Sequence, residues 1–227
     1  NTLHLFALPS LLAILLLQNN RASMEQLLKM VRSIYPFLKS ELFLVWQDDE
    51  LPAVIASTLA AMSAQNLVQR SQDGLWLIPG SNTADYARLH ILSRALRQTL
   101  VRYHMTITVL NQRGSDKLTQ QQLEELCHLL AQRLSFVREF SAPEFFDKAL
   151  FKNFLDTLKG LGYLSVNDDK RLIFNERLSA LASDALQMLP SGIRQAVLQV
   201  TLITDEEVAS ALLALEQSKE RKRLKAA

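Results

Sequence analysis

The run LHLFALPSLLAILLL, from Leu3 to Leu17, decides how the rest of this sequence folds. Almost all of its residues are apolar, and a helix with apolar side chains on every face needs partners on every side. A helix that crosses a membrane needs about 20 predominantly apolar residues. The run is shorter, contains His4 and Pro9, and is followed directly by the polar Gln18. We therefore expect a helix buried in protein or lying on a membrane surface, and not a spanning segment.

The composition is that of a globular and mainly helical protein. The 227 residues are enough for one large domain or two small ones. Hydrophobic residues make up 48%, while only 6 Gly and 6 Pro are present, which argues against a turn-rich β-sandwich. The net charge of +2 is too small to predict nucleic-acid binding by itself. A single cysteine, Cys127, excludes an internal disulfide and a zinc site built from cysteines.

After the opening run, the spacing of polar and apolar residues predicts further helices. Ser23 and Gln26 have the spacing of a capping box, so a second helix begins there. Pro36 is expected to interrupt this helix, which resumes over Phe37–Trp46. The next helix is expected at Glu50–Gln65, with apolar residues at core spacing.

A β-hairpin and a long helix are expected next. The dipeptide Asp73-Gly74 is a strong turn signal, and it separates two short predicted strands, at Leu67–Arg70 and Leu75–Ile78. Asn82 is expected to cap a helix that extends to about Tyr103. The β-branched residues of the following stretch, 105–110, fit either a strand or an extension of that helix.

The pattern then begins again after a polar stretch with one glycine, Asn111–Lys117, which we interpret as a linker. Thr119 and Gln122 form a second capping box. Pro143 is expected to open the next helix, which ends at Gly160 and Gly162. The remaining predicted elements are a hairpin of Tyr163–Val166 and Arg171–Phe174, helices at Glu176–Leu189 and Ser191–Ile203, and a final helix capped by Thr204 and Glu207.

These elements form an internal repeat. Asn66-Leu67-Val68 corresponds to Gly162-Tyr163-Leu164, and Leu75–Ile78 corresponds to Arg171–Phe174. We therefore predict a mostly α fold with two small β-hairpins (α+β), arranged as tandem winged-helix-like repeats. The predicted domains are residues 1–110 (the apolar helix and first repeat), 111–203 (the second repeat) and 204–227 (a C-terminal helix with a basic tail).

A search for catalytic motifs finds none. The sequence contains no G-x-S-x-G elbow and no P-loop, and Gly160-Leu161-Gly162 lacks the third glycine of a dinucleotide loop because Ser165 stands there. Cys127 and His128 are adjacent on a predicted helix and so point in different directions, which prevents them from holding one metal ion. We predict no catalytic, cofactor-binding or metal-binding residue in this chain.

Two groups of charged residues have a functional and a structural interpretation. Glu144 and Asp147 are candidates for general acid or base, but acidic residues in a first helical turn also complement the helix dipole, and we favour that role. The basic tail Lys219–Lys225 fits either an anionic membrane surface or a solvated helix end. The arginines of the helix before Tyr103 fit a phosphate backbone or an exposed face.

Several stretches, in consistent order, resemble the carboxy-terminal region of bacterial membrane-associated glycerol-3-phosphate acyltransferases. They are His4–Leu11, Tyr35–Leu44, Asp49–Pro52, Ala131–Ser135 and Ser141–Ala149. The similarity fades after about Leu178. The resemblance implies a parent enzyme that acylates position 1 of sn-glycerol 3-phosphate, with an acyl thioester of coenzyme A or acyl carrier protein as donor and no cofactor.

The family's catalytic motif is a histidine followed five residues later by an aspartate. The residue five positions after His4 is Pro9; the other three histidines, His90, His104 and His128, are followed at that distance by Ala95, Val109 and Arg133. The resemblance therefore implies a catalytic domain upstream of Asn1. It also implies an enzyme at the cytoplasmic face of the bacterial inner membrane.

The chain is then expected to support that upstream domain of the same polypeptide, or to fix how the domain is oriented on the membrane surface. The opening run becomes a junction helix, with Phe6, Leu8, Leu11, Leu12, Ile14 and Leu15 at interface or core positions. The alternatives are a stand-alone tandem winged-helix module that binds nucleic acid or protein, and a regulatory domain that senses lipid in an apolar groove. Nucleic acid is the less expected partner.

Overall fold

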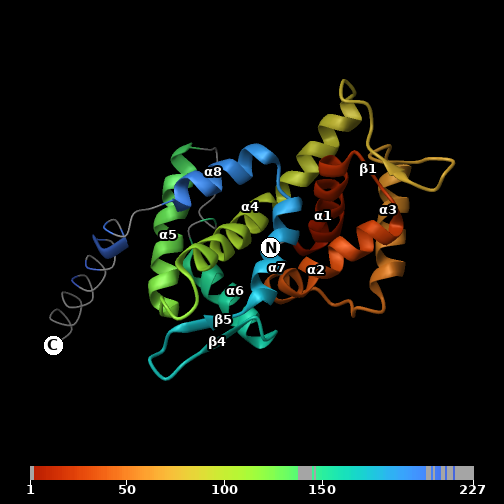
Figure 1. Ribbon diagram of the computed structural model, residues 1–227. Coiled ribbons are helices and arrows are strands. Elements are labelled where there is room, and N and C mark those ends of the chain that lie inside the picture. Colours follow the sequence, from red (N-terminus) through yellow and green to blue (C-terminus); the bar gives the residue numbers. More distant parts are fainter. Residues whose placement is uncertain are drawn as a thin grey trace. The chain divides into compact units, whose positions relative to one another are not determined.

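The computed structural model of the chain describes residues 3–137, 145, 147–202, 206, 208–210, 213 and 217, and of residues 136–137 and 182–187 the backbone only. Its helices and strands are labelled in Figure 1. In chain order they are α1 (Leu3–Asn19), β1 (Arg21–Ala22), α2 (Met24–Leu42), α3 (Leu51–Ala64), β2 (Gln69–Arg70), β3 (Trp76–Leu77), α4 (Ala84–Arg113), α5 (Gln120–Val137), α6 (Lys148–Gly160), β4 (Leu164–Val166), β5 (Leu172–Phe174), α7 (Glu176–Gln187) and α8 (Ser191–Thr201). The prediction of a mostly α chain with two small hairpins is confirmed.

The chain divides into two compact units. The first unit comprises Asn1–Val101 with Ser183–Pro190, and the second comprises Arg102–Ala182 with Ser191–Ala227. The division falls inside α4, which differs from the boundary expected at residue 110. The stretch interpreted as a linker, 111–117, begins as the last turn of α4. Helix α4 continues that far because every residue from Thr99 to Leu110 is buried and remains packed.

Helix α1 is the centre of the first unit and packs against α2, α3 and β1 (Figure 1). From Ala7 to Leu16 every residue except Pro9 is buried by the chain itself. Helical structure and burial in protein were both predicted for this run. Of the residues expected at an interface or in the core, Phe6 is 50% exposed beside the 63% exposed Leu5, and the other five are buried by the chain itself.

Helix α2 begins as predicted and ends differently. The Ser23 Oγ accepts from the Gln26 backbone N–H at 3.1 Å, and the Gln26 Oε1 accepts from the Ser23 N–H at 2.8 Å, so the capping box is confirmed. The predicted interruption at Pro36 was wrong, since α2 runs through it to Leu42. Buried residues lie on both sides of the proline, and their packing outweighs the hydrogen bond that proline cannot make.

The first hairpin is present, and a third strand joins it. Strands β2 and β3 pair antiparallel at the predicted place, and β1 pairs with the other edge of β3, giving the order β1-β3-β2. A strand is predicted from apolar and polar residues that alternate over at least four positions. Strand β1 has only two residues, so the sequence did not predict it.

Helix α4 is capped by a different residue and is longer than predicted. The cap is Thr83 and not Asn82, because the Thr83 Oγ1 accepts from the Tyr86 N–H at 3.2 Å. The ambiguous stretch Met105–Leu110 is helical, and every residue in it is buried. Burial on all sides overrides the β-propensity of these residues, since a fully surrounded helix gains packing at each position.

The second unit contains the end of α4, helices α5, α6 and α8, part of α7 and the hairpin β4–β5. The predicted capping box is confirmed, as Thr119 N–H donates to the Gln122 Oε1 at 2.9 Å and Gln122 N–H donates to the Thr119 Oγ1 at 3.3 Å. Helix α6 begins after Asp147. Pro143, where the sequence predicts a helix start, lies outside the described residues together with Glu144. Hairpin β4–β5 forms where predicted, and a bridge from Thr119 to Arg171 adds a short third segment.

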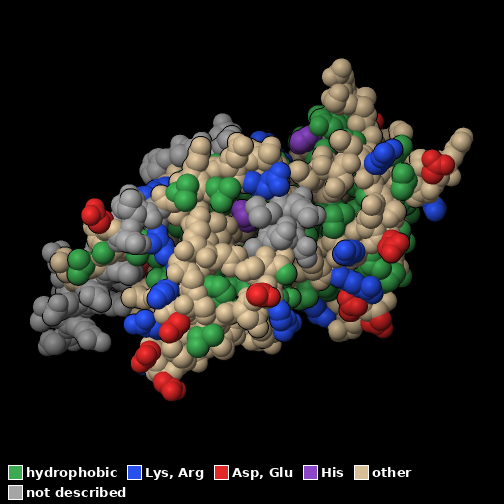
Figure 2. Space-filling model, in the orientation of Figure 1, with side chains coloured by type: hydrophobic (Ala, Val, Ile, Leu, Met, Phe, Trp, Pro, Cys, Tyr) green, Lys and Arg blue, Asp and Glu red, His purple; other side chains and the backbone are tan. Residues whose placement is uncertain are grey.

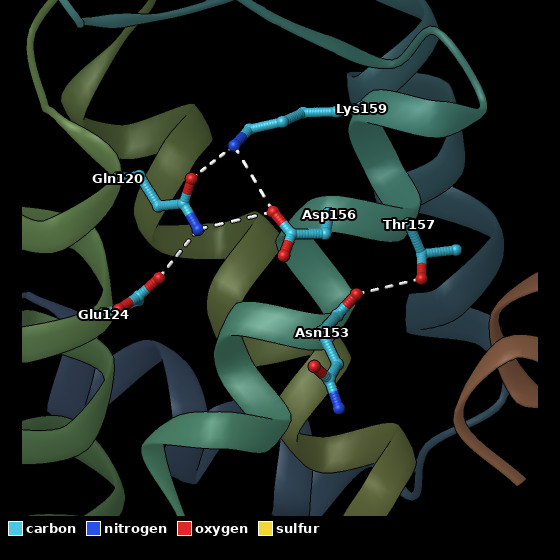
Figure 3. A network of polar contacts seen from close by, with 6 residues as sticks. All are labelled: Gln120, Glu124, Asn153, Asp156, Thr157 and Lys159. Carbon is cyan, nitrogen blue, oxygen red and sulfur yellow. Dashed lines mark hydrogen bonds and ion pairs between the residues drawn. The ribbon is translucent and has the colours of Figure 1, made fainter.

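Polar contacts join α5 to α6 in this unit (Figure 3). The Lys159 ammonium donates to the Gln120 Oε1, and it lies 3.4 Å from the Asp156 Oδ1. The Gln120 amide donates in turn to the Glu124 Oε1 at 2.8 Å and to the Asp156 Oδ1 at 3.5 Å. The network fixes the beginning of α5 beside the end of α6.

Equivalent backbone features recur in the two units at one constant separation, 96 residues. Residues with positive φ recur as Asn20 and Asp116, Asn66 and Gly162, and Gly74 and Lys170. The helix-ending bonds recur as well: the Leu67 N–H donates to the Met62 carbonyl at 2.9 Å, and the Tyr163 N–H donates to the Leu158 carbonyl at 2.8 Å. The residue correspondence predicted from the sequence thus has matching backbone geometry on both sides.

The last predicted elements lie partly outside the described residues. Helices α7 and α8 begin at the expected positions, Glu176 and Ser191. The third capping box, at Thr204 and Glu207, and the basic tail 219–225 are not among the residues that the structure describes.

Candidate functional site

The four histidines lie in four different environments. His4 is exposed, His90 and His128 are half-buried, and His104 is buried. The His128 Nε2 lies 3.1 Å from the Gln132 amide nitrogen on the same helix. Within the part of the chain that the structure describes, no three His, Cys, Asp or Glu side chains gather in a way that could hold a metal ion.

His104 is a neutral residue of the interior. Both of its ring nitrogens are buried without a hydrogen-bond partner among the described residues. Burial lowers the pKa of His104 to about 4, with a smaller contribution from the charge of Arg194. A ring held neutral and enclosed in this way has no route to a substrate, so we assign it to the core.

Cys127 and Asp147 both have structural roles. The Cys127 thiol is fully buried and donates to the Thr106 Oγ1 at 3.7 Å. Burial raises its pKa to about 12, which leaves almost no reactive thiolate. The Asp147 Oδ1 accepts from the Ala149 N–H at 2.8 Å and so caps α6. The structural role that we favoured for Asp147 is confirmed.

An apolar surface follows helix α2. Phe43 is 87% exposed and Val45 is 73% exposed, while Leu44 between them is buried. Phe43 ends α2 in the left-handed conformation at φ 55°, which is unfavourable for a bulky side chain. The Lys39 ammonium and the Tyr35 hydroxyl, both donating to the Trp46 carbonyl at 2.9 Å, hold the following segment in place. Two apolar side chains are thereby presented to solvent on a fixed backbone.

Two hollows lie in the first unit. The larger, of about 640 Å³, lies at the ends of α1 and α2 and is lined by the exposed cations Arg21 and Lys29 together with Met30 and Met188. The smaller, of about 170 Å³, lies against α4, and its polar lining consists of Gln18, Tyr86, His90, Ser93 and Arg97. Neither described lining contains an acidic residue.

The smaller hollow brings cationic groups together. The Arg97 guanidinium donates from Nη2 to the Ser93 Oγ at 3.2 Å, and the Ser93 hydroxyl donates to the His90 carbonyl at 2.7 Å. Burial lowers the pKa of His90, and the charges of Arg97 and Arg94 lower it further. Burial and Arg94 likewise lower the pKa of Arg97. Sequence reasoning noted these arginines only as an arc on one helix and did not predict this cluster.

The surface of the described residues is mixed in charge. Figure 2 shows acidic and basic side chains interspersed on the face drawn. None of the helices described here is both long enough and apolar enough to cross a membrane.

Comparisons with known proteins identify the family of this chain. Residues 1–167 match the family model described as the glycerol-3-phosphate acyltransferase C-terminal region. A glycerol-3-phosphate acyltransferase of Pseudomonas aeruginosa strain PAO1 is 42% identical over 212 residues, which are 93% of this chain and 25% of the relative. The corresponding protein of Pseudomonas savastanoi pv. phaseolicola is 43% identical over 208 residues, 91% of this chain and 25% of the relative.

A third relative, from Pseudomonas fluorescens strain Pf-5, is 40% identical over 219 residues, which are 96% of this chain and 26% of that protein. No solved structure was found to match the chain. The chain thus spans about a quarter of the length of the curated relatives. It belongs to the family of glycerol-3-phosphate acyltransferase C-terminal regions.

Proposed function

We propose that this chain is the non-catalytic C-terminal region of an enzyme that transfers an acyl group to position 1 of sn-glycerol 3-phosphate, the first step of phospholipid synthesis. The observation that carries the proposal is the family match over residues 1–167 combined with coverage of only a quarter of each relative. None of the four histidines is followed by an aspartate at the family's spacing. The general base that accepts the proton of the acceptor hydroxyl therefore lies upstream.

The surroundings of the parent enzyme are part of the same proposal. The acyl donor is a thioester of coenzyme A or of acyl carrier protein, which the upstream domain binds. The enzyme works at the cytoplasmic face of the inner membrane as a peripheral protein, and the tail Lys219–Lys225 supplies positive charge towards anionic lipid.

Acyl transfer by the full-length parent and by the 227-residue chain tests the proposal. The parent transfers a radiolabelled acyl group from palmitoyl coenzyme A to glycerol 3-phosphate, and the chain alone transfers none. A parent in which all four histidines of this region are replaced by glutamine keeps its acyl-transfer chemistry. Turnover by the isolated chain would overturn the assignment.

The winged-helix-like arrangement of two repeats, 1–110 and 111–203, also belongs to this proposal. It is supported by the recurrence of two helices followed by a hairpin, which are α2, α3, β2 and β3 in the first repeat and α5, α6, β4 and β5 in the second. The 96-residue spacing of left-handed residues and helix-ending bonds supports it as well. In the first repeat the other elements surround α1, which is buried from Ala7 to Leu16 except at Pro9.

The upstream domain of the same polypeptide docks, in this proposal, on the apolar surface of Phe43 and Val45. Solvent-exposed apolar side chains on a fixed backbone are typical of an interaction site, and the relatives carry about three quarters of their length outside this region. Phe43 in this segment also has a left-handed backbone, which costs free energy. Contacts of its exposed side chain with a docked domain would offset that cost.

Paired substitutions in the full-length parent test this docking. Phe43→Ser with Val45→Ser should lower acyl transfer and expose the junction to trypsin. Val166→Ser, which removes an apolar side chain that is 47% exposed on strand β4, is the matched control and should leave both unchanged. Equal effects of the two variants would contradict the docking surface.

A module that binds nucleic acid is the alternative function, and the order of helices and hairpins is the observation that favours it. The described wing arginines are engaged within the protein, since Arg70 lies over the Trp76 ring at 5.9 Å and Arg171 donates to the Asp116 carbonyl at 3.2 Å. DNA binding by the chain that weakens steeply with salt would favour this alternative.

A further inference from the structure

We propose that the smaller hollow of the first unit, between the end of α1, helix α4 and residues 189–190, is a binding site for a phosphate group. It is separate from acyl transfer, and it rests on the described residues alone. Its polar lining comes from Gln18, Tyr86, His90, Ser93 and Arg97, and the other residues that line it are apolar.

The size of the hollow sets the size of the ligand. Its volume is about 170 Å³, whereas one water occupies about 30 Å³ in the liquid. There is room for a phosphate with a short organic group. Ile14, Leu17, Leu189 and Pro190 line the remainder of the wall, so any organic part of the ligand meets apolar surface.

The charge of the hollow sets the sign of the ligand. Arg97 is half-buried, and its only described hydrogen-bond partner is the neutral Ser93 hydroxyl. His90 lies beside it, and the exposed Arg94 adds a second guanidinium on the same helix. Helix α1 contributes only uncharged residues to the lining, as do Leu189 and Pro190. An anion would remove the repulsion that the described residues leave uncompensated.

The donors also distinguish a phosphate from a carboxylate. The guanidinium offers a planar fork of N–H groups, which suits two oxygens of one anion. The imidazole, the phenol and the amide of Gln18 reach the same hollow from α4 and α1. A phosphate presents at least three acceptor oxygens in a tetrahedral arrangement, so it can use more donors, and from more directions, than a planar carboxylate with two oxygens.

Ser93 is the residue that positions the guanidinium. It is 1% exposed, and its hydroxyl donates to the His90 carbonyl while its oxygen accepts from Arg97. The Tyr86 ring packs edge-on against the His90 ring, with centroids 4.7 Å apart, which fixes the imidazole. The cations are therefore held in place before a ligand arrives, which lowers the entropic cost of binding.

Histidine NMR of the 227-residue chain tests the site, with the His90 resonance assigned through His90→Gln. Inorganic phosphate, added at constant ionic strength, should shift the His90 resonance saturably and raise the His90 pKa. Ethyl phosphate is the second probe, and acetate and chloride are the controls. Tighter binding of ethyl phosphate identifies a phosphate ester as the ligand, and binding of inorganic phosphate alone identifies free phosphate.

Matched charge removals locate the binding. Arg97→Gln should weaken phosphate binding about tenfold or more, whereas Lys29→Gln, which removes an exposed cation from the larger hollow, should change it less than about twofold. Arg97→Lys keeps the charge but loses the planar fork of N–H groups. Its phosphate affinity should lie between those of Arg97→Gln and Lys29→Gln. Circular dichroism melting of each variant separates lost binding from lost folding.

Sulfate provides a pH test, because its charge stays constant in the range where His90 titrates. Sulfate binding should weaken as the pH rises through the His90 pKa, and it should become independent of pH in His90→Gln. No saturable shift with phosphate, an equal response to chloride, or equal losses in Arg97→Gln and Lys29→Gln would each overturn the proposal.

Discussion

The Ser10 hydroxyl of α1 lies 3.1 Å from the backbone nitrogen of Leu96 in α4 and accepts its hydrogen bond. Both residues are fully buried, and 86 residues separate them in the sequence. Ser10 carries the one polar side chain in the stretch Ala7–Leu16. The contact ties the central helix of the first unit to α4.

Ser10→Ala should therefore destabilise the chain. The substitution removes a buried acceptor, and it should lower the free energy of unfolding by about 1–2 kcal/mol. Urea unfolding followed by circular dichroism measures the change. Ser57→Ala, at an exposed helical position where the hydroxyl donates only to the Val54 carbonyl, is the control. It should change the free energy by less than about 0.5 kcal/mol.

Two glycines near the end of α6 should respond in opposite ways to alanine. Gly162 has φ +73°, whereas Gly160 lies in the helix, and an added Cβ would meet no atom within 4 Å at either position. Gly162→Ala should lower the free energy of unfolding by about 1–2 kcal/mol because of its left-handed backbone. Gly160→Ala should leave it unchanged or raise it by up to about 1 kcal/mol. Similar losses in both would contradict a conformational cause.

The Cys127 thiol should be unreactive in the folded chain. Burial raises its pKa to about 12, so the thiolate is almost absent near pH 8. Ellman's reagent should label Cys127 in urea and not in buffer. Ser57→Cys places a second thiol at an exposed position and should be labelled at once, which controls for the reagent.

His104 should make the stability of the chain depend on pH. Its pKa is about 4 in the folded chain and about 6.5 in the unfolded chain. The unfolded chain therefore binds the proton first, so the stabilisation is complete above about pH 6.5 and is lost as the pH falls towards about 4. Between about pH 7.5 and pH 5 the loss should be about 2 kcal/mol.

Urea unfolding of His104→Leu at both pH values tests this dependence. Because neither ring nitrogen has a hydrogen-bond partner among the described residues, leucine leaves no polar group unpaired. The free energy of unfolding of the wild type minus that of the variant should be about 2 kcal/mol more positive near pH 7.5 than near pH 5. An equal difference at both would show that His104 is not the titrating group.

The sequence alone determined the elements whose signals are local. The capping boxes at Ser23 and Thr119 and the turn at Asp73-Gly74 each depend on side chains and backbone within a few residues. The burial of the opening run also followed from the sequence, since apolar residues on every helical face leave no side for water. The correspondence of Asn66 with Gly162 was visible as well, because both residue types adopt left-handed backbone readily.

The tertiary structure alone decided what depends on packing across long distances. Pro36 stays inside α2 because buried residues on both sides of it keep the helix packed. Residues 105–110 stay helical because burial at every position outweighs their local preference. Strand β1 exists only because β3 offers it a free edge. Gln18, His90 and Arg97 line one hollow because α1 packs beside α4. Gln18 is 72 or more positions from the other two residues, so the sequence pattern could not predict that they meet.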